Sequence, residues 1–429
     1  MSGNQRESHC YVSIPCEHCQ GGIEFDANGF EVNESRNVLC PHCGLETSIF
    51  VPPPETTFPP DLIQVYRKAI GGDTEAQTGL GTFFSLGVGV TQNHAEAIQW
   101  FQKAAMQGLA WGQFCLGFCF ERGNGVAQDY HEAVKWFRKA VEQNYAPAQV
   151  LLGQCYAKGW GVQKDDFEAA KLFCMAAEQG VVIAQILLAA KYDLGIGVQQ
   201  DFHESAKWYR RAADQGDANA QRILGLAYFN GQGVPQNQFE AAKWIQKAAE
   251  QGDIKSQAIL GTYYHRGVGV KKSDVEAIKW IRKAAENGCA EAQFLLGTVY
   301  SDGQAIKKND AEAFRWTFKA AIQGLAAAQY SLAESYCFGR GIPQDDVEAV
   351  KWFTQAAQQK HAEAQTKLGG YYFTGRNVPT DLIEGYKWFL LAAEQGNSTA
   401  KEMCVAASTC LTPEQIAESH RRITMFHGK

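Results

Sequence analysis

The chain repeats itself with a period of 36 residues, and this regularity constrains the fold more than any other feature of the sequence. A glutamine that follows a small residue returns nine times, at Gln77, Gln113, Gln149, Gln185, Gln221, Gln257, Gln293, Gln329 and Gln365. A tryptophan, replaced once by Leu172, keeps the same register at Trp100, Trp136, Trp208, Trp244, Trp280, Trp316, Trp352 and Trp388. A fixed period without insertions is typical of repeat proteins, in which each unit packs mainly on its neighbours.

One unit, residues 217–252, contains two helical stretches. Over 217–229 small and apolar residues recur four apart on one face, and over 237–251 a second apolar face follows. Glycines at 231 and 233 end the first stretch, because glycine adopts the positive φ that a helix C-terminus favours. One helical pair cannot bury its own apolar face, so we interpret the repeated tryptophans and glycines as the frame of a stack.

The unit resembles the Sel-one-like repeat (SLR), a relative of the tetratricopeptide repeat. The matching pattern is Ala-x-Ala-Gln-x-x-Leu-Gly-x-x-Tyr-x-x-Gly-x-Gly-Val, followed by Glu-Ala-x-Lys-Trp-x-x-Lys-Ala-Ala-Glu-Gln-Gly, and it covers residues 61–400. The resemblance implies an all-α protein, a right-handed α/α solenoid of about nine 36-residue helical hairpins, that serves as an interaction adaptor or scaffold. Ala189 and Ala333 replace the helix glycine of the pattern, and Ala305 and Asn377 replace the second loop glycine.

Both ends of the repeated region depart from the pattern, as the ends of a solenoid must. Residues 62–73 predict a lone second helix that starts the stack. Residues 401–429 predict a C-terminal capping helix that covers the last repeat. Within them Thr412 is the expected N-cap, and Gln415 completes a capping box with it.

Four cysteines near the N-terminus have the spacing of a zinc site. Cys16 and Cys19 form one Cys-x-x-Cys pair, and Cys40 and Cys43 form a second. Four thiolates complete a tetrahedron and leave no open position, so we predict a structural rather than a catalytic Zn²⁺. Two disulfides in an exported domain are the alternative.

Residues 1–51 therefore predict a small β zinc ribbon that precedes the solenoid. Alternating residues around Asn28 and Gly29 predict a hairpin inside it. The proline-rich residues 52–60 predict a semi-stiff linker to the solenoid.

Charge and hydropathy exclude several classes of partner. The net charge of −6, and seven acidic residues against Arg6 and Arg36 in residues 1–51, argue against a nucleic-acid surface. No uncharged apolar stretch reaches about 18 residues, so we expect no membrane insertion. The N-terminus lacks the apolar segment of a signal peptide, so we expect a cytoplasmic protein whose remaining cysteines are buried free thiols.

The sequence contains no His-Glu-x-x-His, no Gly-x-Ser-x-Gly and no phosphate-binding loop that ends in Lys-Ser/Thr. We therefore expect a non-enzymatic adaptor that binds a protein or peptide. A hydrolase-like enzyme with its site in the solenoid groove is the alternative.

Residues that vary from unit to unit are the natural carriers of partner specificity. In the first helices, which line the concave surface of helical-hairpin solenoids, the positions one, five and eight after the repeated glutamine vary. From three units we predict partner-binding residues at Phe114, Phe118, Glu121, Arg222, Leu226, Phe229 and His265. The alternative is that the apolar residues among them pack between neighbouring first helices.

Overall fold

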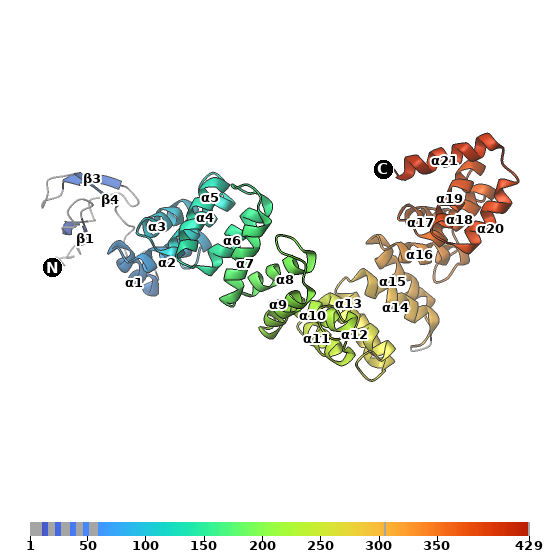
Figure 1. Cartoon of the computed structure of the whole chain (residues 1–429), viewed down its shortest axis with the longest axis horizontal. Helices are drawn as coiled ribbons and strands as arrows, with labels where there is room; N and C mark the ends of the chain where they lie inside the picture. Colours follow the sequence, from blue (N-terminus) through green and yellow to red (C-terminus); the bar gives the residue numbers. More distant parts are fainter. Residues whose placement is uncertain are drawn as a thin grey trace, which may run out of the picture. The chain divides into compact units, whose positions relative to one another are not determined.

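The computed structural model describes four strands within the first 50 residues, and residues 59–303 and 306–427 (Figure 1). The strands are β1 (Tyr11–Pro15), β2 (Gly22–Asp26), β3 (Ser35–Leu39) and β4 (Glu46–Phe50). They form two antiparallel pairs, β1 with β2 and β3 with β4.

The turn predicted about Asn28 and Gly29 lies in residues 27–34, which are outside the described residues. The described strand β2 pairs with the preceding strand β1, with Pro15 opposite Gly22.

The helices confirm the all-α repeat at the predicted period. The first helices of the units are α2 (Thr74–Leu86), α4 (Ala110–Arg122), α6 (Ala146–Lys158), α8 (Val182–Leu194), α10 (Ala218–Asn230), α12 (Ile254–Arg266), α14 (Ala290–Asp302), α16 (Ala326–Phe338) and α18 (Ala362–Thr374). The second helices are α3 (His94–Met106), α5 (Tyr130–Glu142), α7 (Asp166–Glu178), α9 (Phe202–Asp214), α11 (Gln238–Glu250), α13 (Asp274–Glu286), α15 (Asp310–Ile322), α17 (Asp346–Gln358) and α19 (Leu382–Glu394). Helix α1 (Pro60–Ile70) is the predicted lone second helix, and α20 (Ser398–Ser408) and α21 (Pro413–His427) close the chain.

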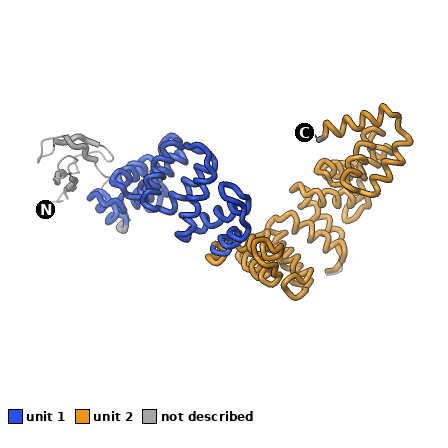
Figure 2. Tube along the Cα trace, in the orientation of Figure 1, with its two compact units in different colours: residues 1–211 blue, residues 212–429 orange. Residues whose placement is uncertain are grey.

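The chain divides into two compact units, Met1–Arg211 and Ala212–Lys429 (Figure 2). We call them unit 1 and unit 2. Helices α2 to α8 belong to unit 1, and helices α10 to α21 belong to unit 2.

Small residues bring the two helices of each repeat close together. A Cβ added to Gly225 in α10 would lie 2.8 Å from Cγ1 of Ile245 in α11, so only a glycine fits there without a shift. Leu224 and Ile245 are fully buried, and Trp244 is 3% exposed. The repeated glycine and tryptophan are therefore packing residues, as the sequence predicted.

The repeated glutamine also has a structural role that its spacing alone did not reveal. Gln221 is buried, and its Nε2 donates to the carbonyl oxygen of Ala213, 3.1 Å away, in the helix before it. Its Oε1 accepts from Nε2 of Gln251, 2.8 Å away, at the end of its own repeat. We call this pair of side chains, 30 residues apart, a glutamine rung.

The same rung recurs in both units. It joins Gln77 to Gln107, Gln113 to Gln143, Gln149 to Gln179, Gln293 to Gln323, Gln329 to Gln359 and Gln365 to Gln395. Buried amides that are fully paired hold neighbouring helices in one register, because an unpaired amide in that place is destabilising.

The connection between the two helices of a repeat is held at both ends. In the repeat that begins with α4, the amide of Asp129 donates to the carbonyl oxygen of Phe120, 2.9 Å away, and closes the connection on itself. Gly125 has φ +77°, and a Cβ added to it would lie 2.5 Å from the carbonyl oxygen of His94 in the preceding repeat. The second loop glycine is therefore a point of close approach between repeats.

Helix α21 covers the end of the stack. Its capping box is formed as predicted: Gln415 Oε1 accepts from the amide of Thr412 at 2.9 Å, and Thr412 Oγ1 accepts from the amide of Gln415 at 3.3 Å. Phe426 packs edge-on against Trp388 of α19, with ring centroids 5.5 Å apart. Among the described helices none is both long and apolar enough to span a lipid bilayer.

Candidate functional site

We call the positions one, five and eight after each repeated glutamine the first-helix face. In unit 1 the structure places its predicted members in a packed cluster. Phe114 lies 5.5 Å from the ring of Tyr145, which opens the next first helix, and 6.2 Å from Phe137 of its own repeat. Phe118 stacks on Phe114 and lies under the guanidinium of Arg122. Both rings are half-buried.

Glu121 was predicted to be exposed for binding, but the structure buries its side chain. Glu121 is 5% exposed, and burial raises the pKa of its carboxyl, opposed by the positive charges of Arg122 and Lys158. The eighth position lies close to the next repeat in this unit, so helical spacing alone did not reveal its burial.

In unit 2 the predicted residues of α10 contact the next repeat. Phe229 stacks on Tyr263 of α12 with ring centroids 5.5 Å apart. Arg222 Nε lies 3.5 Å from Oδ2 of Asp253, and its Nη2 donates to Asn219. Leu226 packs with them against a buried cluster. For Phe114 and Phe229 the structure therefore favours the packing alternative, and binding by these residues stays a prediction.

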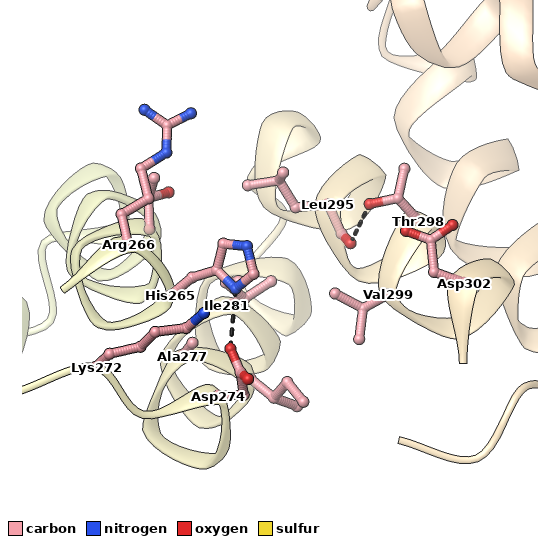
Figure 3. Close-up of a pocket in the computed structure, with 12 residues that line it drawn as sticks. His265, Arg266, Lys272, Asp274, Ala277, Ile281, Leu295, Thr298, Val299 and Asp302 are labelled. Carbon is pink, nitrogen blue, oxygen red and sulfur yellow. Dashed lines mark hydrogen bonds and ion pairs between the residues drawn. The ribbon is translucent and has the colours of Figure 1, made fainter. Parts of the chain in front are cut away.

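His265 is different, because it is exposed and lines a hollow. Its Nδ1 lies 3.0 Å from Oδ1 of Asp274. Figure 3 shows residues of α12 and the following connection on one side of this hollow, and Leu295, Val299 and Asp302 of α14 on the other. The hollow has a volume of about 570 Å³. We call it the α12–α14 hollow.

Two further hollows continue the series along unit 2. The α14–α16 hollow has a volume of about 160 Å³ and shares Thr298 and Asp302 with the first. The α16–α18 hollow has a volume of about 310 Å³ and shares Glu334 with the second. Each hollow lies between consecutive first helices, and we call this row of three hollows the groove.

The chemistry changes along this groove. The α12–α14 hollow has apolar residues of α13 and α14 below charged residues of the α12 side. The α14–α16 hollow is mostly polar, with Ser301, Ser331 and Ser335 in its lining. In the α16–α18 hollow the thiol of Cys337 lies 3.0 Å from the hydroxyl of Tyr371.

Sequence reasoning missed most residues of the groove. Of the predicted residues, His265 is the one that belongs to the lining of these three hollows. The missed residues include Thr298, Glu334, Cys337, Arg340 and Arg376. Three of them, Thr298, Glu334 and Cys337, stand at the fifth or eighth position after the glutamine. The same spacing rule, carried into the last three repeats, would have found them.

Burial makes two of the described thiols, Cys119 and Cys155, unreactive. The free cysteines among the described residues are Cys115, Cys119, Cys155, Cys174, Cys289, Cys337, Cys404 and Cys410, but only Cys119 and Cys155 are buried as expected, and Cys410 is exposed. Burial raises the pKa of Cys155 to about 12 and that of Cys119 to about 11. A thiol with such a pKa is a poor nucleophile at neutral pH, because the thiolate is the reactive form.

The predicted zinc ligands Cys16, Cys19, Cys40 and Cys43 lie outside the described residues. The strands that flank them are described, and they have matching registers. Pro15 is opposite Gly22, and Leu39 is opposite Glu46. Within each pair, therefore, six residues connect the first strand to the second. The two cysteines stand first and fourth among those six in both cases. Within the described helices no group of three or more potential metal ligands occurs.

Comparisons with known proteins identify the family of the repeat. The Sel1 repeat model matches residues 74–109, 112–145, 146–181, 182–217, 218–253, 254–289, 290–325, 326–361 and 362–397. The crystal structure of c5321, a protective antigen of uropathogenic Escherichia coli strains that displays an SLR fold, is similar at 31% identity, with a TM-score of 0.56. It covers 85% of this chain and 86% of that chain. A Sel1 repeat protein from Oxalobacter formigenes is similar at 30% identity, over 73% of this chain and 91% of that chain, with a TM-score of 0.59. A search of curated proteins gave no match.

Proposed function

Because the chain belongs to the Sel1 repeat family, we propose that it is a non-enzymatic scaffold that binds a protein or peptide partner on its first-helix face. The observation that carries this proposal is the row of three hollows between consecutive first helices of unit 2. An extended peptide fits such a row, because each repeat presents one recess for one side chain or a few.

The test uses the full-length protein as bait and a variant that fills the groove. Thr298 lines two of the hollows, so Thr298→Trp occupies both with one change. We expect the variant to lose the partners that mass spectrometry identifies with the wild type, while its circular dichroism spectrum is unchanged.

The matched control places the same side chain away from the groove. Val275 on α13 is 78% exposed and lines none of the three hollows. Val275→Trp should therefore keep every partner. Partner recovery that survives Thr298→Trp with the fold intact would overturn the first-helix face as the binding surface.

The alternative of a hydrolase-like enzyme with its site in the groove has less support. Cys337, the thiol in the α16–α18 hollow, has a raised pKa because of burial. A panel of hydrolase substrates tested on the purified protein separates the two proposals. Turnover that Thr298→Trp abolishes would favour the enzyme.

We also propose that Cys16, Cys19, Cys40 and Cys43 hold one structural Zn²⁺ in residues 1–51. In both strand pairs the two strands are connected by six residues, and cysteines stand first and fourth among those six. This arrangement suits two pairs of thiolates that bind the same ion. Zinc bound by four thiolates would fix the two strand pairs to each other and supply no catalytic water. We propose in addition that the protein works in the reducing cytoplasm and that it binds neither nucleic acid nor membrane.

A further inference from the structure

Positive charge is concentrated at two neighbouring connections of unit 2. The segments 267–273 and 303–309, which join first to second helices, each contain two lysines and no carboxylate. The corresponding segments of the other repeats have no net positive charge, and the whole chain has a net charge of −6. The two basic segments follow α12 and α14, the two first helices that border the α12–α14 hollow.

The cations on the α12 side of this hollow are available. Arg266, Lys271 and Lys272 are exposed, and in the described part of the chain none of them has an ion-pair partner. The nearby carboxylate of Asp274 is held instead by His265, at 3.0 Å. Arg266 and Lys272 belong to the lining of the hollow.

The charged lining residue on the opposite rim is an acid, because Lys307 and Lys308 of the connection after α14 are absent from the lining and Lys308 pairs with Asp310 at 3.5 Å. Asp302 of α14 lines the hollow and has no ion-pair partner among the described residues. Figure 3 shows Asp302 across the hollow from Lys272. A ligand that crosses the hollow therefore meets Arg266 and Lys272, together with the carboxylate of Asp274 that His265 pairs, on one side, and the carboxylate of Asp302 on the other.

Between the rims of the hollow lie several apolar side chains. Its lining includes Ala277, Ile278 and Ile281 of α13, and Leu295 and Val299 of α14. A volume of about 570 Å³ lies within the range in which pockets hold a large side chain or a small ligand, about 300–1,000 Å³. Apolar walls favour an aliphatic or aromatic side chain that leaves water.

We propose that the α12–α14 hollow binds an extended peptide whose large apolar residue enters the hollow, with acidic residues on one side of it only. The acidic side faces Arg266 and Lys272, and Asp302 repels a carboxylate on the other side. This inference rests on the proposed function, because it names the chemistry of the partner at the same groove.

The experiment selects peptides from a random nonapeptide library displayed on phage, with the immobilised full-length protein. We expect the selected peptides to share a large apolar residue with Asp or Glu on one side. The selected peptide, labelled with fluorescein, is then titrated by fluorescence anisotropy. The double variant Arg266→Glu/Lys272→Glu should weaken its binding about tenfold or more, since attraction becomes repulsion.

Two controls make the result specific. Lys255 is exposed at the other end of α12 and is absent from the lining, so Lys255→Glu changes one charge on the same helix and should have little effect. Thr298→Trp should remove binding by filling the hollow, and a peptide with alanine in place of its apolar residue should not bind.

Selected peptides that are basic or uncharged, or binding that the double variant leaves unchanged, would overturn this inference. If Thr298→Trp still abolishes partner recovery in the bait experiment, the proposed function stands and only the peptide chemistry is wrong. If no peptide is selected and partner recovery is also insensitive to Thr298→Trp, both proposals fail. Nucleic acid that binds in place of peptides would likewise contradict the inference.

Discussion

Gln257 lacks the hydrogen-bond partner that the repeated glutamines share. Its buried Oε1 accepts no hydrogen bond. The residue 30 positions later is Asn287, which has one methylene fewer than the glutamine that completes the other rungs. An amide oxygen buried without a donor destabilises the fold by about 1–3 kcal/mol, so this rung is a local weak point.

The variant Asn287→Gln should restore this rung and stabilise the repeat by about 1 kcal/mol. The reciprocal change Gln251→Asn removes the donor to Gln221 and should destabilise the neighbouring repeat by about 1–3 kcal/mol. Native-state amide hydrogen exchange in α10 to α13 measures both effects locally. Shifts of the same sign in the two variants would contradict the assigned role of the rung.

His361 makes the N-terminus of α18 sensitive to pH. Its side chain caps α18 by accepting from the amide of Ala364, its ring stacks on Tyr330 at 4.9 Å, and Glu363 lies 3.4 Å away. Burial lowers the pKa of His361 from 6.5, and the negative charge of Glu363 only partly opposes this effect. The unfolded chain therefore takes up the proton at a higher pH than the folded chain does.

The stabilising contribution of His361 should be complete above pH 6.5, and it should be lost as the pH falls below that value toward the lowered folded pKa. Hydrogen exchange of the first turn of α18 at pH 7.5 and pH 5 measures the loss. His361→Asp should remove this dependence, because aspartate caps a helix while ionised. Equal protection of the wild type at both pH values would be inconsistent with the cap.

At the scale of helices, local sequence signals were sufficient. The bounds predicted for one unit, 217–229 and 237–251, agree within one residue with α10 (Ala218–Asn230) and α11 (Gln238–Glu250). The reason is local: Asp217 accepts from the amide of Ala220 as N-cap, and Gly231 adopts φ +71° as C-cap. Asn377, which replaces a loop glycine, adopts φ +55°, and Ala305 lies outside the described residues.

Trp244→Ala should destabilise its repeat by about 3–5 kcal/mol, because it deletes a large side chain that is 3% exposed. Each repeat touches mainly its neighbours, so the damage should stay near α11. Hydrogen exchange should show faster opening of α10 to α12 and unchanged protection in α17 to α19. A loss spread evenly over unit 2 would argue against local coupling.

At the scale of the whole molecule, the period determines that helices stack but not which surfaces stay open. The frame residues follow from repetition alone, since copies must bury identical faces. The groove depends instead on individual side chains, as at Glu121, which is buried, and at His265, which is exposed at the same position of another repeat. Long-range pairings such as the glutamine rung were also invisible to the periodicity of a single helix.

The proposed zinc site should be independent of the repeats. Protein purified without chelators should contain one zinc per chain by elemental analysis, and Cys40→Ser should lose it. Zinc bound to such sites contributes roughly 10–16 kcal/mol, so residues 1–51 should unfold without the metal. The far-ultraviolet circular dichroism of the helices should barely change, and protein that holds no zinc would refute the site.

The clamped connections have a consequence for how such a chain grows. Gly125 abuts the preceding repeat, and Asp129 closes the same connection on Phe120. A connection fixed at both ends cannot lengthen by one residue without losing one of these contacts. Gene duplication can therefore add or delete whole blocks of 36 residues without disturbing these contacts, whereas a small insertion within a connection should disrupt at least one of them. Each added block would extend the proposed first-helix face by the three variable positions of one more first helix.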